Sequence, residues 1–244
     1  MECFHDAGYV VYGSSRQGGI KDPRVKSVVL DVRDDESCQE AVRLIIAESG
    51  RLDLLINNAG MGVSGPVELI PEQDTLEQVD ANLLGCLRMS RAALPYLRET
   101  GGRILNVGSV AASAPIPFQA LYSASKAAVR TLSLALDSEC RPLGVRSLCI
   151  EFGDMKTGFT AARKKSGSGD SVYAKRCEKS VARMEEDEQS GMDPSVGAKL
   201  LLRVAQAHNP KPVTVCGISY KLVTLLIKLT PVRFSQWILG LMYG

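Results

Sequence analysis

The chain has 244 residues, 45% of them hydrophobic and 23% charged, a composition that excludes disordered and fibrous proteins. This length suits one large α/β domain spanning residues 1–244. The formal charge is only +2, and the short basic run at 163–165 is matched by an acidic run at 185–188, which we interpret as solvated surface. Because nucleic-acid binders carry a concentrated basic patch, we expect no nucleic-acid partner.

Cysteine usage and hydropathy indicate the compartment. The seven cysteines are scattered without any Cys-x-x-Cys pair, so we expect neither a disulfide framework nor a metal site. The first residues lack the basic and apolar parts of a signal peptide. No stretch reaches the roughly 18 apolar residues that a membrane span needs. A cytoplasmic protein, with membrane association left open for its tail, is the expectation.

The first quarter of the chain alternates helical and extended patterns. A short helix at 2–7 stops at Gly8, and a helix at 36–48 is capped by Asp34 or Asp35 and stops at Gly50. Apolar runs between and after these helices predict strands at 9–12, 25–30 and 52–56.

The same alternation continues to residue 216. We expect a long helix at 74–98, a strand ending at Gly108, a helix through 127–136 and a strand at 145–150. After a polar stretch, Asp193 caps a helix at 194–206, and a last strand follows at 212–216. Strands that alternate with helices predict a doubly wound parallel sheet.

Tyr122 and Lys126 stand four residues apart at the head of a helical run, so their side chains leave one face of the helix. A nearby ammonium favours the phenolate and is expected to pull the tyrosine pKa down from about 10, towards the range of a working acid or base. Ser109 follows the strand that ends at Gly108, where its hydroxyl can reach a substrate oxygen beside the tyrosine.

Two further motifs stand in register with this group. Asn57-Asn58-Ala59-Gly60 follows the strand at 52–56, and Asn82 lies inside the long helix, where an amide has poor helix propensity. Together with Ser109, Tyr122 and Lys126, these residues resemble the short-chain dehydrogenase/reductase family over nearly the whole chain. The resemblance implies a Rossmann-like, three-layer αβα fold and catalysis by Asn82, Ser109, Tyr122 and Lys126. Asn82 would bind a water that relays protons to Lys126, or would simply make a helix-to-sheet hydrogen bond.

The resemblance also implies a nicotinamide cofactor site. Arg16 follows the strand at 9–12 where a carboxylate would select NAD, so it favours the 2′-phosphate of NADP(H), unless it is only an exposed loop residue. By the same resemblance, Asp31 and Val32 would contact the adenine, and Gly60 would let the backbone pass close to the adenine ribose. Asn58 is equally suited to bracing the sheet. The full set of expected cofactor-binding residues is Arg16, Asp31, Val32, Asn58, Ala59, Gly60, Tyr122, Lys126, Gly153 and Thr157.

One family feature is missing from the sequence. No first strand and no glycine-rich phosphate turn precede the helix at 2–7. Since neighbouring strands lie about 4.8 Å apart, removing one leaves a gap of roughly 9.6 Å unless the sheet collapses. We therefore predict a sheet lacking its first strand, and interpret Met1 as an internal methionine of a longer protein or the start of a truncated product.

Two segments bear on substrate and partners. Residues 160–192 occupy the variable substrate lid of the family. The tail at 220–244 is apolar, divided by Pro231 and rimmed by basic residues and the only tryptophan. It suits peripheral membrane contact, a lid over a greasy pocket or a subunit interface. The resemblance implies a homo-oligomer.

Two functions follow from these patterns. The first is an NADP-dependent oxidoreductase that interconverts a carbonyl and an alcohol on a small, apolar or lipid-like molecule. The second is a non-catalytic binding module or inactive fragment, favoured by the missing phosphate turn.

Overall fold

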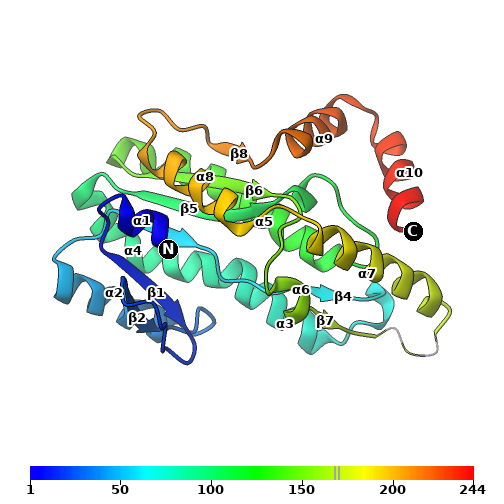
Figure 1. Cartoon of the computed structure of the whole chain (residues 1–244), viewed down its shortest axis with the longest axis horizontal. Coiled ribbons are helices and arrows are strands. Elements are labelled where there is room, and N and C mark those ends of the chain that lie inside the picture. Colours follow the sequence, from blue (N-terminus) through cyan, green and yellow to red (C-terminus); the bar gives the residue numbers. More distant parts are fainter. Residues whose placement is uncertain (168, 170) are drawn as a thin grey trace.

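The computed structural model describes residues 1–167, 169 and 171–244 of the chain, and its helices and strands follow one another along most of the sequence (Figure 1). The strands are β1 (Val11–Ser15), β2 (Val25–Val29), β3 (Leu54–Asn57), β4 (Val63–Ser64), β5 (Arg103–Ser109), β6 (Arg146–Phe152), β7 (Lys164–Lys165) and β8 (Val213–Val215). The α-helices are α1 (Glu2–Asp6), α2 (Asp35–Ser49), α3 (Glu72–Val79), α4 (Gly85–Thr100), α5 (Ala120–Cys140), α6 (Phe159–Ala162), α7 (Ala174–Gln189), α8 (Pro194–Gln206), α9 (Ile218–Leu229) and α10 (Val232–Tyr243).

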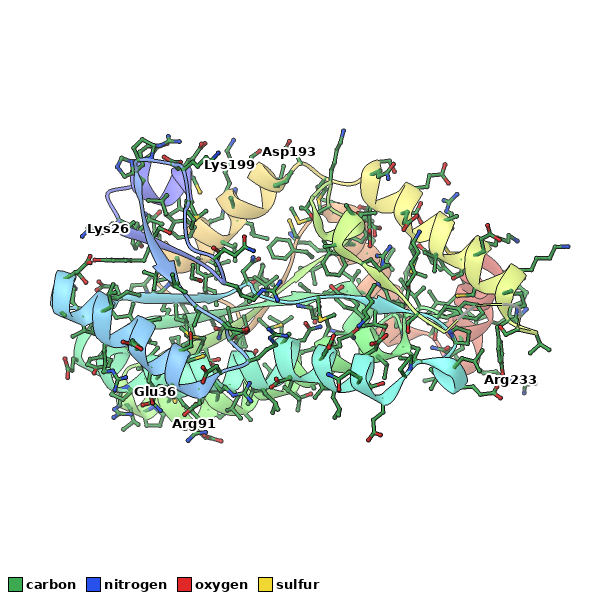
Figure 2. The ribbon with its side chains drawn as sticks, turned by 90° about the horizontal axis from the view of Figure 1, so that it is seen from below. Lys26, Glu36, Arg91, Asp193, Lys199 and Arg233 are labelled. Carbon is green, nitrogen blue, oxygen red and sulfur yellow. The ribbon has the colours of Figure 1, made fainter. Side chains whose placement is uncertain are left out.

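Every strand pair in the described residues is parallel, as the alternating pattern predicts. The central sheet has the order β3-β5-β6-β8, and β1 pairs with β2 in a separate two-stranded sheet. Helices cover both faces: Figure 2 shows the sheet between α2 and α4, which carry Glu36 and Arg91, and α8, which carries Lys199. This is the predicted Rossmann-like, three-layer fold.

The side chains on the two faces of the sheet build separate cores. On the α1 and α8 face, Phe4 and Val204 pack with Leu105, Leu148 and other apolar side chains of the sheet. On the α4 and α5 face, Leu97 and Leu136 pack with residues that include Ile104 and Val145. The alternation of strand side chains between faces therefore buries β5 and β6 on both sides.

Between β1 and β3 the sheet is open. In the part of the chain that the structure describes, each of these strands is hydrogen-bonded on one side only, β1 to β2 and β3 to β5. Side chains of both strands, including Val11, Tyr12, Leu54 and Ile56, line a cavity of about 1530 Å³. The gap expected from the missing first strand is present, and the sheet has not collapsed across it.

Apart from residues 168 and 170, which lie outside the described residues, the segment at 160–192 holds more secondary structure than its polar composition indicates. It contains the end of α6, the short β7 and the whole of α7, whose Cys177, Val181 and Met184 are buried at a spacing of four and three residues. The solvated surface predicted for the basic run is wrong for Arg163, whose side chain is fully buried against Glu188. Its neighbours pair at the surface, Lys164 with Asp74 at 2.6 Å and Lys165 with Glu185 at 2.8 Å.

The apolar tail forms the two short helices divided at Pro231. Among the described helices, none combines the length and the apolarity that a bilayer crossing needs. The same described residues hold seven free cysteines and no cluster of potential metal ligands.

Candidate active site

Ser109, Tyr122 and Lys126 come together at the carboxyl end of β5. Ser109 is the last residue of β5, and α5 begins two residues before Tyr122, so the strand end and the first helical turns face one another. The Lys126 ammonium lies 5.7 Å from the centre of the Tyr122 ring. Both line the large cavity together with Ser109. The tyrosine and lysine therefore project from one side of their helix towards the serine, as their spacing predicts.

The pKa of Tyr122 differs from the sequence-based expectation. Burial raises it from 10.0 to about 12, while a side-chain hydrogen bond with Ser109 acts in the opposite direction. The ammonium of Lys126 lies over the ring and donates to the carbonyl oxygen of Val107 at 2.8 Å. Lys126 is not among the groups that dominate this pKa, so the lowering predicted from its spacing is not found, and the phenol is protonated at neutral pH.

Lys126 is itself 6% exposed, and removing its charge from water lowers its pKa from 10.5 to about 8. At neutral pH the ammonium form still predominates. A buried cation beside a phenol stabilises that phenol's anion more than its neutral form.

Asn82 lies in a π-helical turn, Asp80–Leu84, that joins α3 to α4. Such turns widen a helix by one residue and often occur at functional sites. The Asn82 amide donates to the Met61 carbonyl oxygen at 2.9 Å and to Ser125 Oγ at 3.0 Å, and its Oδ1 accepts from the Met61 N–H at 2.8 Å. Asn82 thus fastens the turn after β3 to α5, and its side chain lies next to Gly60.

The two asparagines after β3 have different surroundings. Asn57 Nδ2 donates to Asn106 Oδ1 at 2.8 Å and to Ser90 Oγ at 3.2 Å, which ties β3 to β5 and α4. Asn58 is exposed and lines the cavity with Ala59 and Gly60. Asn57 therefore braces the sheet, and the side chain of Asn58 can face a ligand in the cavity.

The remaining expected cofactor residues divide into two groups. Val32, Gly153 and Thr157 line the same cavity as Tyr122 and Lys126. Arg16 is exposed, and Asp31 is held by Arg33 through a 2.6 Å ion pair that, together with Arg16, lowers the Asp31 pKa to about 2. Neither Arg16 nor Asp31 is among the lining residues that the structure describes, although Ser14, close to Arg16, is.

The fit to a nicotinamide dinucleotide is uneven along the cavity. At the ribose and nicotinamide end, the buried cation of Lys126, the exposed Asn58 and the phenol of Tyr122 offer the polar groups that such a ligand needs. At the pyrophosphate end, the sequence has no glycine-rich turn opening a helix. These residues fit one half of the dinucleotide better than the other.

Several side chains of the site carry no signal in the sequence. Phe159 of α6 packs on the Tyr122 ring at 5.5 Å between centroids and occupies the space beside Gly62. Tyr220 of α9 lies directly over Gly153 and donates to Asp154 Oδ2 at 2.7 Å. Only the tertiary fold brings these residues to the cavity.

Comparison with known proteins agrees with this geometry. A parallel sheet between helix layers, with a serine, tyrosine and lysine at one strand end, defines an oxidoreductase of the nucleotide-binding α/β class. The family model described as short chain dehydrogenase matches residues 10–167, and the chain belongs to that family.

Individual relatives cover much of the chain. A 3-ketodihydrosphingosine reductase from Bacteroides thetaiotaomicron is 35% identical over 248 residues, covering 100% of this chain and 92% of its own length. An NADPH-dependent 1-acyldihydroxyacetone phosphate reductase from Schizosaccharomyces pombe is 35% identical over 159 residues, covering 63% of this chain and 54% of its own. The crystal structure of a short-chain dehydrogenase from Streptomyces avermitilis superposes with a TM-score of 0.84 at 26% identity, covering 95% of this chain and 87% of that one.

Proposed function

We propose that the chain is an NADP-dependent oxidoreductase that interconverts a carbonyl and an alcohol on an apolar, lipid-like substrate. The observation that carries this proposal is one cavity of about 1530 Å³ in which Ser109, Tyr122 and Lys126 face a lining from the apolar C-terminal helices. The names of the relatives from Bacteroides thetaiotaomicron and Schizosaccharomyces pombe, reductases of lipid-type ketones, support the substrate class.

Each catalytic side chain has a proposed task. A bound NADPH would supply the hydride. The Ser109 hydroxyl donates a hydrogen bond to the substrate carbonyl oxygen, and Tyr122 transfers its phenolic proton to that same oxygen as negative charge develops there. With a pKa of about 12, Tyr122 holds its proton at neutral pH, which suits the direction of carbonyl reduction. The buried Lys126 ammonium then stabilises the phenolate that remains.

Asn82 has a proposed role in restoring the proton. Its two amide hydrogens are used by Met61 and Ser125, so a relay water would bond to Asn82 Oδ1 or to the adjacent backbone, and would pass protons to Lys126. Asn82 also positions the Gly60 backbone next to the lysine.

The preference for NADP rests on charge. Arg16 follows β1 with no carboxylate at that strand end, and a guanidinium pairs well with a phosphate. The relative from Schizosaccharomyces pombe, described as NADPH-dependent, supports this choice.

A non-catalytic binding module is the second candidate. The open gap between β1 and β3 in the described residues favours it. Titration with NADPH and NADH, followed by nicotinamide fluorescence, separates the two candidates. NADPH binding accompanied by oxidation of NADPH in the presence of a long-chain 3-ketone supports the enzyme, and the absence of both supports the binding module.

The catalytic assignment has its own test in Tyr122→Phe. Losing the phenolic proton should lower turnover about a thousandfold, a general-acid contribution, while the circular dichroism spectrum stays unchanged. Tyr96→Phe on α4, a residue that is not among the described lining residues of the cavity, serves as the control. Undiminished turnover in Tyr122→Phe would remove the tyrosine from the mechanism.

A further inference from the structure

The helices α9 and α10, called here the C-terminal hairpin (residues 218–243), expose apolar side chains on their outer side. On α9 the exposed apolar residues that do not line the cavity recur at intervals of four, three and four, which places them on one helical face, while the exposed Val223 and Leu226 line the cavity. On α10 a second group includes the only tryptophan of the chain. The exposed fractions are 77% for Ile218, 56% for Leu222, 52% for Leu225, 73% for Leu229, 74% for Val232, 60% for Trp237 and 68% for Leu241.

The inner side of the same hairpin is also apolar. Val223 and Leu226 of α9, with Ile238 and Met242 of α10, line the large cavity. A single layer of helix, about 10 Å thick, therefore separates the cavity from the outside.

Polar contacts at both ends hold the hairpin in this orientation. Tyr220 near its start donates to Asp154 at 2.7 Å, and Tyr243 at its end donates to Asp187 of α7 at 3.0 Å. Figure 1 shows α9 and α10 standing out from the body of the molecule, with the end of α10 beside α7. The outer apolar face is thus presented by an anchored element.

The charges of the hairpin have one sign. Residues 218–244 contain Lys221, Lys228 and Arg233 and no aspartate or glutamate. Figure 2 places Arg233 at the outer end of the molecule, far from Lys26 of β2. A second copy docking symmetrically on this face would bring cations against cations without an acidic side chain between them. An anionic lipid surface is complementary to both the charge and the apolar stripe.

We propose that the C-terminal hairpin docks on the surface of an anionic lipid bilayer. The stripe from Ile218 to Leu229 lies among the upper acyl chains, Trp237 sits at the headgroup level, and the cationic side chains contact lipid phosphates and carboxylates. The hairpin lies on the membrane and does not cross it. This docking concerns where the chain works, and is independent of which cofactor or ketone the cavity takes.

Vesicle binding tests the proposal without any activity measurement. The purified full chain is sedimented with phosphatidylcholine vesicles, and with vesicles in which phosphatidylserine replaces part of the phosphatidylcholine. We expect cosedimentation with the second kind, together with a blue shift of Trp237 emission and quenching by brominated lipid. Because Trp237 is the only tryptophan, this fluorescence reports the hairpin alone. No cosedimentation with either kind of vesicle overturns the proposal.

Matched variants separate the hairpin from the rest of the surface. Leu222→Glu should weaken vesicle binding at least about tenfold, whereas Leu76→Glu on α3, at the same 56% exposure, should leave it unchanged. Lys228→Gln should weaken it about fivefold, the effect of one cation at an anionic surface. A tryptophan blue shift that instead grows with protein concentration in the absence of lipid, and disappears in Leu222→Glu, would assign this face to a second copy of the chain.

Discussion

Two of the three sheets in the described residues, the four-stranded sheet and the β1–β2 pair, support opposite ends of the cavity and differ in how firmly they are held. In the four-stranded sheet, β5 and β6 are hydrogen-bonded on both sides, and Ile104, Leu105, Leu148 and Ile150 are completely buried. In the β1–β2 pair each strand has one partner, and Val29 is 64% exposed. Two strands by themselves are marginally stable. The proposed catalytic residues are thus held by the well-packed four-stranded sheet, whereas Arg16 and Asp31 follow strands of the less stable β1–β2 pair.

Side-chain packing, rather than hydrogen bonding, joins the two sheets. Leu55 of β3 packs in the same cluster as Val28 and Leu30, and Val11 of β1 packs against the cluster that holds Leu105. Contacts of this kind are weaker at the edge of a cavity, where part of the surrounding atoms is missing. The comparison therefore predicts that the β1–β2 pair opens first, and the experiments below test how far it behaves as a separate unit.

Amide hydrogen exchange should show the largest difference. Amides in the β5–β6 ladder open only with the whole molecule, whereas those between β1 and β2 open locally, so their exchange should be roughly a thousandfold faster or more. Exchange read by mass spectrometry or NMR checks this. Equal protection of the two ladders would mean that both sheets unfold as one unit.

Shortening a buried side chain should lower the free energy of unfolding by different amounts beside the two sheets. Leu148→Ala in β6 leaves a closed void and should lower the free energy of unfolding by about 2–5 kcal/mol. Leu30→Ala, directly after β2 and beside the open cavity, should cost less than about 2 kcal/mol, because little new void forms. Denaturant unfolding followed by circular dichroism gives both values, and a larger cost for Leu30→Ala would reverse the comparison.

Replacing Lys126 by methionine should raise the free energy of unfolding at pH 7 and abolish turnover. Folding lowers the lysine pKa from 10.5 to about 8, so between these values the unfolded chain binds more protons and the wild-type free energy of unfolding rises with pH. At pH 7, the Lys126→Met variant should therefore be more stable than the wild type by on the order of 2 kcal/mol. This value allows for the loss of the hydrogen bond from Lys126 to Val107. The advantage should shrink as the pH passes from 8 towards 10.5. A pH-independent difference would contradict the burial argument.

The smallest effect is expected at the β1 end. Arg16→Ser should raise the KM for NADPH about tenfold and leave that for NADH unchanged, because the guanidinium would contact only the 2′-phosphate. Arg43→Ser is the matched control, since the exposed Arg43 pairs with Glu36 on α2 and is not among the described lining residues. Equal changes with both cofactors would show that Arg16 does not select between them.

Local signals predicted much of the architecture. Asp34 accepts from the Glu36 N–H at 3.0 Å and Gly50 ends α2 with a φ of 71°, as their residue types indicate. Asp193 caps α8 in the same way, and Pro231 divides α9 from α10. The open gap beside β1 followed from counting strands against the family pattern. These features depend on residues close in sequence or on a complete motif.

Features that depend on distant residues were missed. The buried apolar stripe of α7 consists of only three residues, and its partners include Ile116, Phe118 and Tyr243. The polar composition of the helix therefore gave no sign of the stripe. The side chain of Asn82 in the π-helical turn bonds to Met61 and Ser125, which lie in distant segments of the chain. The pKa of Tyr122 depends on how deeply the cavity wall covers it, which four-residue spacing to a lysine does not reveal.

Gly153, directly after β6, lies against Tyr220 of the C-terminal hairpin, so the end of β6 and the hairpin depend on each other. A β-carbon there would lie 2.2 Å from the Tyr220 ring, far inside van der Waals contact. Any larger residue must therefore push the ring aside and break its bond to Asp154. Among relatives of this chain, residues 153 and 220 should vary together: a methyl group gained at the first requires the loss of the aromatic ring at the second, so that a substitution in the cavity wall is accompanied by one in the segment that we propose docks on the membrane.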